Sequence, residues 1–564
     1  MNHLLSQLIN KGVRLSATPA GELKIQLGSY VLTEQEKNAI KANKSQILDY
    51  LSGGKVACQS YSQERLWFLD RLGYGTQYHV PGFGRIDGQL DVAALSKTVN
   101  FLSARHESLR TNFTTLDNTA LQMIRPGSDV AIERVDLSNL APEAQQAAQK
   151  QQLQNFLERP FNLENDALFR VLLIKISAQT HILGLCLHHI ITDGWSMRVL
   201  LRDLLEAYAA FSNAEFPELK PLPLDYSAYA VWEREVLTDA KLARELSYWK
   251  TQLSGYQNLA LPLDYVRPAR VSGQGGYRQF ALPQAQGRLI KQVSKARKTT
   301  AFTLFMSAVY TLLSKYSNQA DICMGMPVAN RYERDVEEIV GFFVNTVVMR
   351  INPPDDQVLT VNSLLTHVQQ VIVKGQDNQN VPVEKILELL QPERDLSRSP
   401  IFQVLINYTP LSLGKMPFGN CTLEPLFEFE IKEAKFDLNF TFNEFDDDRA
   451  TIGIEYASDL YNLNTIERMS RHLATLMQCF VESPELPVAE IELVDAAERT
   501  LLLNDWNGTE TDYPKAYCVH ELFAEQAAKT PDNLAVIFAD RHLSYRQLHE
   551  KSTQLAIYLQ QQGV

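Results

Sequence analysis

Several features that define common protein classes are absent or scarce in this sequence of 564 residues. No apolar run approaches the roughly 20 residues that a membrane-spanning helix needs, and the N-terminus lacks the basic start and long apolar core of a signal peptide. The six cysteines show no pairing pattern, which is typical of reduced thiols. We therefore expect a cytoplasmic protein that has no membrane partner.

Positive charge and metal-binding motifs are also scarce. Lys and Arg number 54 against 66 Asp and Glu, which gives a formal net charge of -12. A nucleic-acid surface needs clustered Lys and Arg, so we expect no nucleic-acid partner. Neither an HExxH motif nor a CxxC pair occurs, and these are common ligand sets of zinc sites. We therefore expect no metal site.

The sequence does contain enough apolar residues, 45% of the total, to bury the cores of several domains. Its middle part alternates strands and helices, which indicates the α/β class. Strands at 171–176 and 182–187 are predicted to pair as a hairpin, and helices are predicted at 195–210 and 301–316.

Two adjacent histidines follow the strand predicted at 182–187. That strand is almost wholly apolar, so we expect it to be buried on both faces. His188 and His189 then point in opposite directions because side chains alternate along a strand, and Asp193 and Gly194 follow in a predicted turn. A histidine at a strand end is more often a buried hydrogen-bonding residue than a catalytic group, and an adjacent pair can also bind a metal. The segment alone leaves these roles open.

Residues 188–194 resemble the HHxxxDG signature of condensation domains of non-ribosomal peptide synthetases, within the chloramphenicol-acetyltransferase-like superfamily. Companion motifs that resemble those of the family follow the same order at residues 62–69, 105–113, 226–232, 341–346, 376–384 and 394–404. The resemblance implies two chloramphenicol-acetyltransferase-like lobes that form a V-shaped pseudo-dimer. We expect the lobes at residues 57–235 and 236–490, and they would meet at the histidine.

The resemblance also implies an acyltransferase-type reaction that forms an amide bond. A donor acyl or peptidyl thioester would react with the amine of an acceptor aminoacyl thioester, and the phosphopantetheine arms of two carrier proteins would hold these substrates. His189 would accept the amine proton or orient the amine, and His188 would support it. Gly194 would let backbone approach the reacting centre. No cofactor is expected for the condensation step itself.

Four further residues are predicted to support the site. By the resemblance, Asp193 forms a structural ion pair with an arginine, for which we predict Arg110, with Arg105 as the second candidate. Trp195 begins the helix after the motif. Asn345 is either a polar contact in the cleft or a turn residue at a strand end.

Residues 1–52 are predicted to form a small α+β unit of helix, hairpin and helix. Thr33 would cap the second helix, with Glu36 completing a capping box. This order resembles the TubC-type N-terminal docking domain of assembly-line synthetases, which implies binding to an upstream synthetase subunit. The alternative is a helical cap that packs on the following domain.

The sequence after residue 490 changes in character. Residues 491–515 are predicted to be a linker, and residues 516–564 resemble the start of an AMP-binding adenylation domain, which would be a partner in the same chain. Two other functions stay open for the middle region. One is an epimerization domain of the same superfamily, and the other is a catalytically silent module that recruits carrier proteins or tailoring enzymes.

Overall fold

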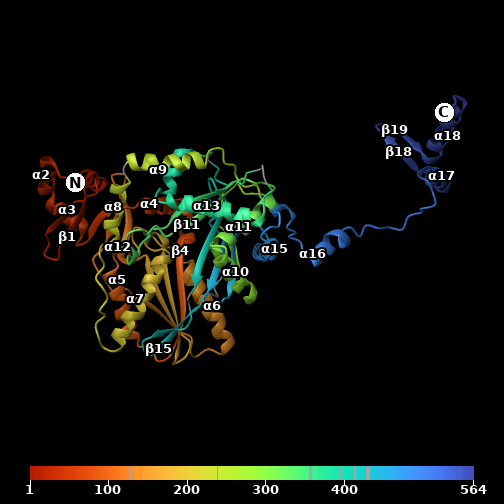
Figure 1. Cartoon of the computed structure of the whole chain (residues 1–564). Helices are drawn as coiled ribbons and strands as arrows, with labels where there is room; N and C mark the ends of the chain where they lie inside the picture. The colour runs from red at the N-terminus through yellow and green to blue at the C-terminus, as the bar shows by residue number, and fades with distance from the viewer. Residues whose placement is uncertain (128, 238, 355–357, 394, 412–413, 427–431) are drawn as a thin grey trace. The chain divides into compact units, whose positions relative to one another are not determined.

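A computed structural model describes residues 1–127, 129–237, 239–354, 358–393, 395–411, 414–426 and 432–564. The chain divides into two compact units, Met1–Leu493 and Val494–Val564 (Figure 1). Arg394, the first residue of the last predicted motif, lies outside the described residues.

The first lobe is built on a six-stranded sheet in the order β14-β15-β4-β9-β8-β7. Its strands include β4 (His79–Asp87), β7 (Ile132–Asp136), β8 (Phe169–Lys175) and β9 (Thr180–His188). The predicted β8–β9 hairpin is confirmed, and every residue of β9 after Thr180 is buried, as its apolar sequence predicts. The helices are α4 (Tyr61–Leu69), α5 (Val92–Arg105), α6 (Pro142–Glu158), α7 (Gly194–Ser212) and α8 (Tyr226–Val236). Helices α5 and α7 pack side by side (Figure 1).

The second lobe has a six-stranded sheet in the order β10-β17-β16-β13-β11-β12. The strands are β10 (Gly275–Ala281), β11 (Ile322–Val328), β12 (Asn345–Ile351), β13 (Val404–Leu411), β16 (Leu438–Phe445) and β17 (Ala450–Ala457). The helices are α9 (Asp239–Gln252), α10 (Gln284–Ala296), α11 (Ala301–Ser317), α12 (Arg334–Glu337), α13 (Val361–Asp377), α14 (Val383–Leu390) and α15 (Leu463–Glu482). Sheets and helices of both lobes give the α/β class that the sequence predicts.

The second half of the chain contributes structure to the first lobe. Strands β14 (Met416–Phe418) and β15 (Cys421–Leu426) come from the second half of the chain, yet β15 pairs with β4 in the sheet of the first lobe. Val340 and Phe342 are likewise buried in the core of the first lobe. The second half of the chain therefore completes the lobe that holds the histidines.

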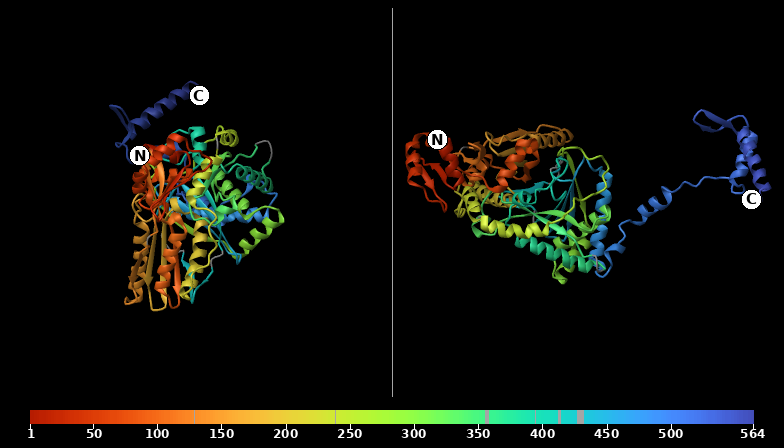
Figure 2. Two further views of the ribbon diagram at one scale, coloured as in Figure 1. Left: turned by 90° about the vertical axis from the view of Figure 1, so that its left-hand side faces the viewer. Right: turned by 90° about the horizontal axis from the view of Figure 1, so that it is seen from above.

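Residues 1–52 form helix α1 (Asn2–Asn10), the predicted hairpin of β1 (Arg14–Ala17) and β2 (Leu23–Gln26), and helices α2 (Glu34–Ala42) and α3 (Lys44–Leu51). The capping box of Thr33 and Glu36 is confirmed. Strand β1 also pairs with β3 (Lys55–Cys58), so the hairpin joins a five-stranded sheet, β2-β1-β3-β6-β5, with β5 (Thr111–Leu116) and β6 (Thr119–Ile124). Figure 2 shows residues 1–52 (red) directly beside the part of the chain that follows them (orange).

The second unit contains helices α16 (Ala496–Thr500), α17 (Val519–Lys529) and α18 (Tyr545–Gln561) and a hairpin of β18 (Leu534–Phe538) and β19 (Arg541–Ser544). In the described part of the whole chain, no helix is both long enough and apolar enough to cross a membrane.

Candidate active site

The histidine motif lies where strand β9 ends and helix α7 begins. His188 is the last residue of the strand, and His189 opens a single 3-10 turn, His189–Ile191. Asp193 is then the N-cap of α7, because its carboxylate accepts a hydrogen bond from the Ser196 N–H. Residues 192–194 therefore form the entry to a helix, where the sequence predicted a simple turn.

His189 is held through one of its ring nitrogens. Nδ1 lies 2.7 Å from the carbonyl oxygen of Thr192, which assigns the proton to Nδ1 and leaves Nε2 as an acceptor. The half-buried ring packs edge-on against Phe342, with 4.9 Å between the centroids. Burial, together with the positive charge of Lys435, lowers the pKa of His189 to about 4. The imidazole is therefore neutral near pH 7.

His188 occupies a different environment. Its side chain is fully buried, and Nδ1 accepts a hydrogen bond of 3.2 Å from the Ile190 N–H. The rings of Tyr78, His79 and Phe161 surround it at centroid distances of 6.2 to 6.4 Å. These contacts favour a core role for His188, and its predicted support of His189 stays a prediction.

The Asp193 carboxylate, also fully buried, is saturated with hydrogen bonds. Oδ1 accepts from the Ser196 N–H at 2.7 Å and lies 3.2 Å from the Arg331 guanidinium. Oδ2 accepts from the Phe343 N–H at 3.0 Å. Asp193 therefore joins the start of α7 to the chain segment of residues 331–343, which fits a structural carboxylate.

Arg331 is the cation of this ion pair, so the prediction of Arg110 is wrong. Its guanidinium also donates to the Ile339 carbonyl at 2.7 Å and to Ser196 Oγ at 2.7 Å, and it stacks over the Phe343 ring at 3.8 Å. Sequence reasoning missed Arg331. The sequence gives only a weak indication of this residue, which is its position between strand β11 and the motif at 341–346.

The two arginines named from the sequence bind elsewhere. Arg110 donates to the carbonyl of Arg125, at the end of the β5–β6 hairpin. Arg105 binds the carboxylate of Asp203 at 2.9 Å and the Lys220 carbonyl at 2.7 Å. Because a helix rises about 1.5 Å per residue, Asp203 lies far along α7 from Asp193. Neither arginine reaches the histidine motif.

Trp195 and Asn345 have structural contacts. Trp195 donates through its ring nitrogen to the Glu337 carbonyl at 2.8 Å. Asn345 is buried at the start of β12, and its amide group donates to the carbonyls of Gln379 and Val381 at 2.8 and 2.7 Å. These bonds favour the second interpretation of Asn345, a residue that fixes a strand end.

Gly194 lies on the exposed surface of the helix start. A Cβ atom added to it would meet nothing within 4 Å, so packing within the chain does not require a glycine here. Its predicted role, to admit a substrate close to the backbone, stays a prediction.

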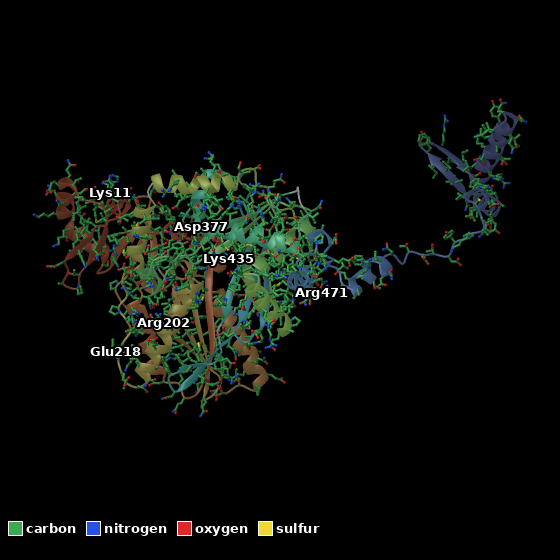
Figure 3. The ribbon with its side chains drawn as sticks, viewed as in Figure 1. Lys11, Arg202, Glu218, Asp377, Lys435 and Arg471 are labelled. Carbon is green, nitrogen blue, oxygen red and sulfur yellow. The ribbon has the colours of Figure 1, made fainter. Side chains whose placement is uncertain are left out.

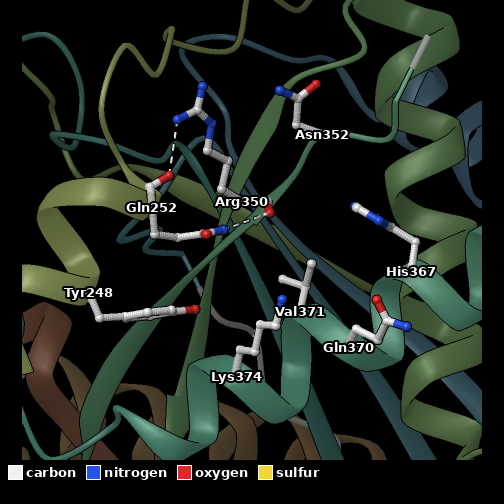
Figure 4. A pocket seen from close by; sticks show the side chains of 8 residues that line it. All are labelled: Tyr248, Gln252, Arg350, Asn352, His367, Gln370, Val371 and Lys374. Atoms are coloured by element: carbon white, nitrogen blue, oxygen red, sulfur yellow. Dashed lines mark hydrogen bonds between the residues drawn. The ribbon is translucent and has the colours of Figure 1, made fainter. Parts of the chain in front are cut away.

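A separate pocket lies in the second lobe, away from the motif. It has a volume of about 300 Å³ and is lined by Tyr248, Gln252, Arg350, Asn352, His367, Gln370, Val371 and Lys374 (Figure 4). Arg350 is bound to Asp321 at 2.6 Å and to the Gln252 carbonyl at 3.0 Å. None of the predicted site residues lines this pocket.

Comparison with known proteins gives consistent matches. A family model described as a condensation domain matches residues 55–503. A linear gramicidin synthase of Brevibacillus parabrevis is 37% identical over 508 residues, which are 90% of this chain but 6% of that protein. The chain therefore spans only a small part of the relative's length.

Two solved structures support the predicted two-lobed fold. The X-domain in its complex with OxyB from teicoplanin biosynthesis has a TM-score of 0.69 at 26% identity, covering 78% of this chain and 96% of that one. Holo-AB3403, a four-domain non-ribosomal peptide synthetase bound to AMP and glycine, has a TM-score of 0.77 at 21% identity, covering 90% of this chain and 39% of that one.

Proposed function

The chain belongs to the condensation-domain family of non-ribosomal peptide synthetases, and from this premise we propose that it forms an amide bond beside His189. The acceptor amine nitrogen bonds to the carbonyl carbon of the donor thioester and loses one proton. The carbon–sulfur bond then breaks, and the phosphopantetheine sulfur leaves with the electron pair and takes up a proton. Both substrates are carried by carrier proteins.

The observation that carries the proposal is the fixed orientation of the His189 ring. With Nδ1 bound to the Thr192 carbonyl, the ring presents the lone pair of Nε2 as an acceptor for an amine N–H. Burial and Lys435 keep the pKa of this imidazole near 4, so the ring is a weak base near pH 7. We infer that His189 mainly orients the amine, because orientation of two tethered reactants can supply much of the rate.

The reaction is tested by loading donor and acceptor carrier proteins separately and detecting the dipeptidyl thioester by mass spectrometry. A dipeptidyl product that depends on His189 supports the proposal. Carrier binding without product would favour the silent recruitment module. The X-domain, a structural neighbour, has been solved in a complex with OxyB, which is the reason to keep this alternative. Solvent deuterium at the donor α-carbon without condensation would favour epimerization.

We propose that residues 1–52 receive an upstream synthetase protein at strand β2. This strand is the edge of the five-stranded sheet, and an edge strand can pair with a segment of a partner. Lys24 is its exposed residue. Lys24→Glu should weaken association with the upstream protein without changing the melting temperature, and equal affinity would contradict the proposal.

A point substitution is a sharper test of docking than removal of residues 1–52. Leu8 and Leu15 of this segment share one buried core with Val56, Leu121 and Val231 of the following lobe. Deletion would expose those apolar side chains, so a loss of condensation after deletion would not report on docking.

We propose that residues 491–515 are a linker and that residues 516–564 begin an adenylation domain that acts in the same chain. The second unit leaves large apolar side chains exposed, which supports a domain whose remaining part covers them. They include Ile537, Phe538, Leu555 and Tyr558.

A further inference from the structure

Phe342 is a buried aromatic residue from the second half of the chain that contacts the His189 ring. Its ring lies edge-on to the imidazole, with 4.9 Å between the centroids and an angle of 67° between the ring planes. Only 3% of Phe342 is exposed, and it belongs to the core of the first lobe. The imidazole is therefore held in two ways, by the Thr192 carbonyl at Nδ1 and by packing against Phe342.

The backbone on both sides of Phe342 is bonded to the first turn of α7. The Gly341 N–H donates to Ser196 Oγ at 3.1 Å, and the Ser196 hydroxyl lies 2.8 Å from the Gly341 carbonyl oxygen. On the other side, the Phe343 N–H donates to the Asp193 carboxylate at 3.0 Å. Phe342 is therefore mounted on a segment that is fixed to the helix directly following the histidines.

Two further contacts hold the same segment. The Tyr226 hydroxyl donates to the Phe342 carbonyl and lies 2.9 Å from the Ser60 hydroxyl. Farther along α7, the Arg202 guanidinium, labelled in Figure 3, binds the Glu338 carboxylate at 2.5 Å. Because these bonds fix the backbone, the Phe342 ring has a defined place from which to pack against the imidazole.

We propose that Phe342 is a positioning residue for condensation, whose ring keeps the imidazole of His189 in the plane that directs Nε2 at the acceptor amine. The torsion that sets the plane of a histidine ring is intrinsically broad. A single hydrogen bond at Nδ1 still lets the ring tilt, and packing against an aromatic edge restricts that motion. The inference rests on the proposed role of His189 in amide formation, because orientation supplies rate only through that ring.

The inference is tested by a double-mutant cycle of wild type, Phe342→Leu, His189→Ala and the double variant. Single-turnover condensation between loaded carrier proteins is measured for each, at a temperature well below its melting transition. Phe342→Leu should lower the rate of the wild type about tenfold, the upper range for an aromatic pair. In the His189→Ala background the same substitution should leave the residual rate unchanged, because no imidazole remains to be positioned. A merely structural role would give the same loss in both backgrounds.

Phe343→Leu is the matched control. Phe343 is the neighbouring residue and is equally buried, but its ring packs over the Arg331 guanidinium at 3.8 Å and against the Tyr226 ring at 5.0 Å. Its substitution should lower the melting temperature and leave the rate below the transition near wild type. If Phe342→Leu does not fold, Phe342→Met gives the same comparison, since methionine is apolar and flexible and lacks the ring.

An equal loss of rate in both backgrounds would overturn the inference, and so would an unchanged rate when Phe342→Leu is made in the wild type. A matching loss in Phe343→Leu would overturn it as well, because the effect would then belong to core packing in general. These results differ from failure of the proposed function, which is a wild-type protein that yields no dipeptidyl thioester or a His189→Ala variant that condenses at the wild-type rate.

Discussion

His189 and Asp193 belong to one short motif but occupy opposite physical situations. His189 uses one ring nitrogen to bind Thr192 and keeps the other as an acceptor. Asp193 has both carboxylate oxygens occupied, by Ser196, Phe343 and Arg331. The proposed chemistry therefore falls to the imidazole end of the motif, and the carboxylate end joins α7 to the segment of residues 331–343.

Because of this difference, measurements of stability and of condensation rate should respond to different substitutions in the motif. A substitution at the carboxylate end should lower the free energy of unfolding, and activity should fall with it. A substitution at the imidazole end should lower the rate while the folded state keeps its stability. A triad in which the carboxylate serves the histidine would predict equal rate losses at both ends, without loss of stability at either.

The largest effect is expected for Asp193→Ala. Removing one partner of a buried ion pair leaves Arg331 charged and unpaired, which costs about 3–5 kcal/mol of stability. Soluble yield and melting temperature should both drop sharply. Arg331→Met should also lower the soluble yield and the melting temperature, because it leaves the buried Asp193 carboxylate without its cation.

The double substitution Asp193→Ala with Arg331→Met is the control for this pair. It removes both charges, so it should be more stable than either single variant. A folded, stable Asp193→Ala protein with only its rate reduced would contradict the structural role of the carboxylate.

The second prediction concerns His189→Ala. Loss of the group that orients the amine should reduce single-turnover condensation by about 10²–10³-fold. The melting temperature should stay close to wild type, because the ring is only half-buried. His188→Ala is the matched control: that ring is fully buried, so its removal should lower the melting temperature.

The third prediction contrasts Asp193 with another buried carboxylate, Glu233. Two uncharged donors, the Tyr61 N–H at 3.0 Å and the Tyr229 hydroxyl at 3.2 Å, hold Glu233, and burial raises its pKa to about 7. The pKa of Glu233 is higher in the folded protein than in the unfolded chain, so its neutral carboxyl stabilises the fold. This stabilisation is complete below about pH 4.3 and is lost as pH rises through 7.

Glu233→Gln removes this titration. The wild type should lose about 3 kcal/mol more stability than the variant between pH 5 and pH 8.5. Melting temperatures of both proteins at the two pH values measure the difference. Parallel pH dependence of the two proteins would show that Glu233 is ionised throughout.

Local features of this chain could be predicted from the sequence, because neighbouring residues determine them. The β8–β9 hairpin, the burial of β9, helix α7 and the capping box at Thr33 follow from apolar periodicity and cap chemistry. The family motif pointed to His189, and the structure adds the bond that orients it.

Contacts between distant segments could not be predicted in the same way. Strand β15 pairs with β4, and β1 pairs with β3, through tertiary packing that no local pattern encodes. The arginine partner of Asp193 was missed for the same reason. A motif shows that a cation is needed, but the crossing of residues 331–343 over α7 decides which arginine supplies it.

The smallest effect is expected for Arg110→Ala, which tests that choice of arginine. Arg110 donates to the Arg125 carbonyl and does not reach Asp193. Its loss should cost about 1 kcal/mol or less, the usual net value of one hydrogen bond, and should leave condensation close to wild type. Urea unfolding of this variant beside Arg331→Met measures the contrast. Equal destabilisation by the two substitutions would mean that the ion pair of Asp193 is assigned to the wrong arginine.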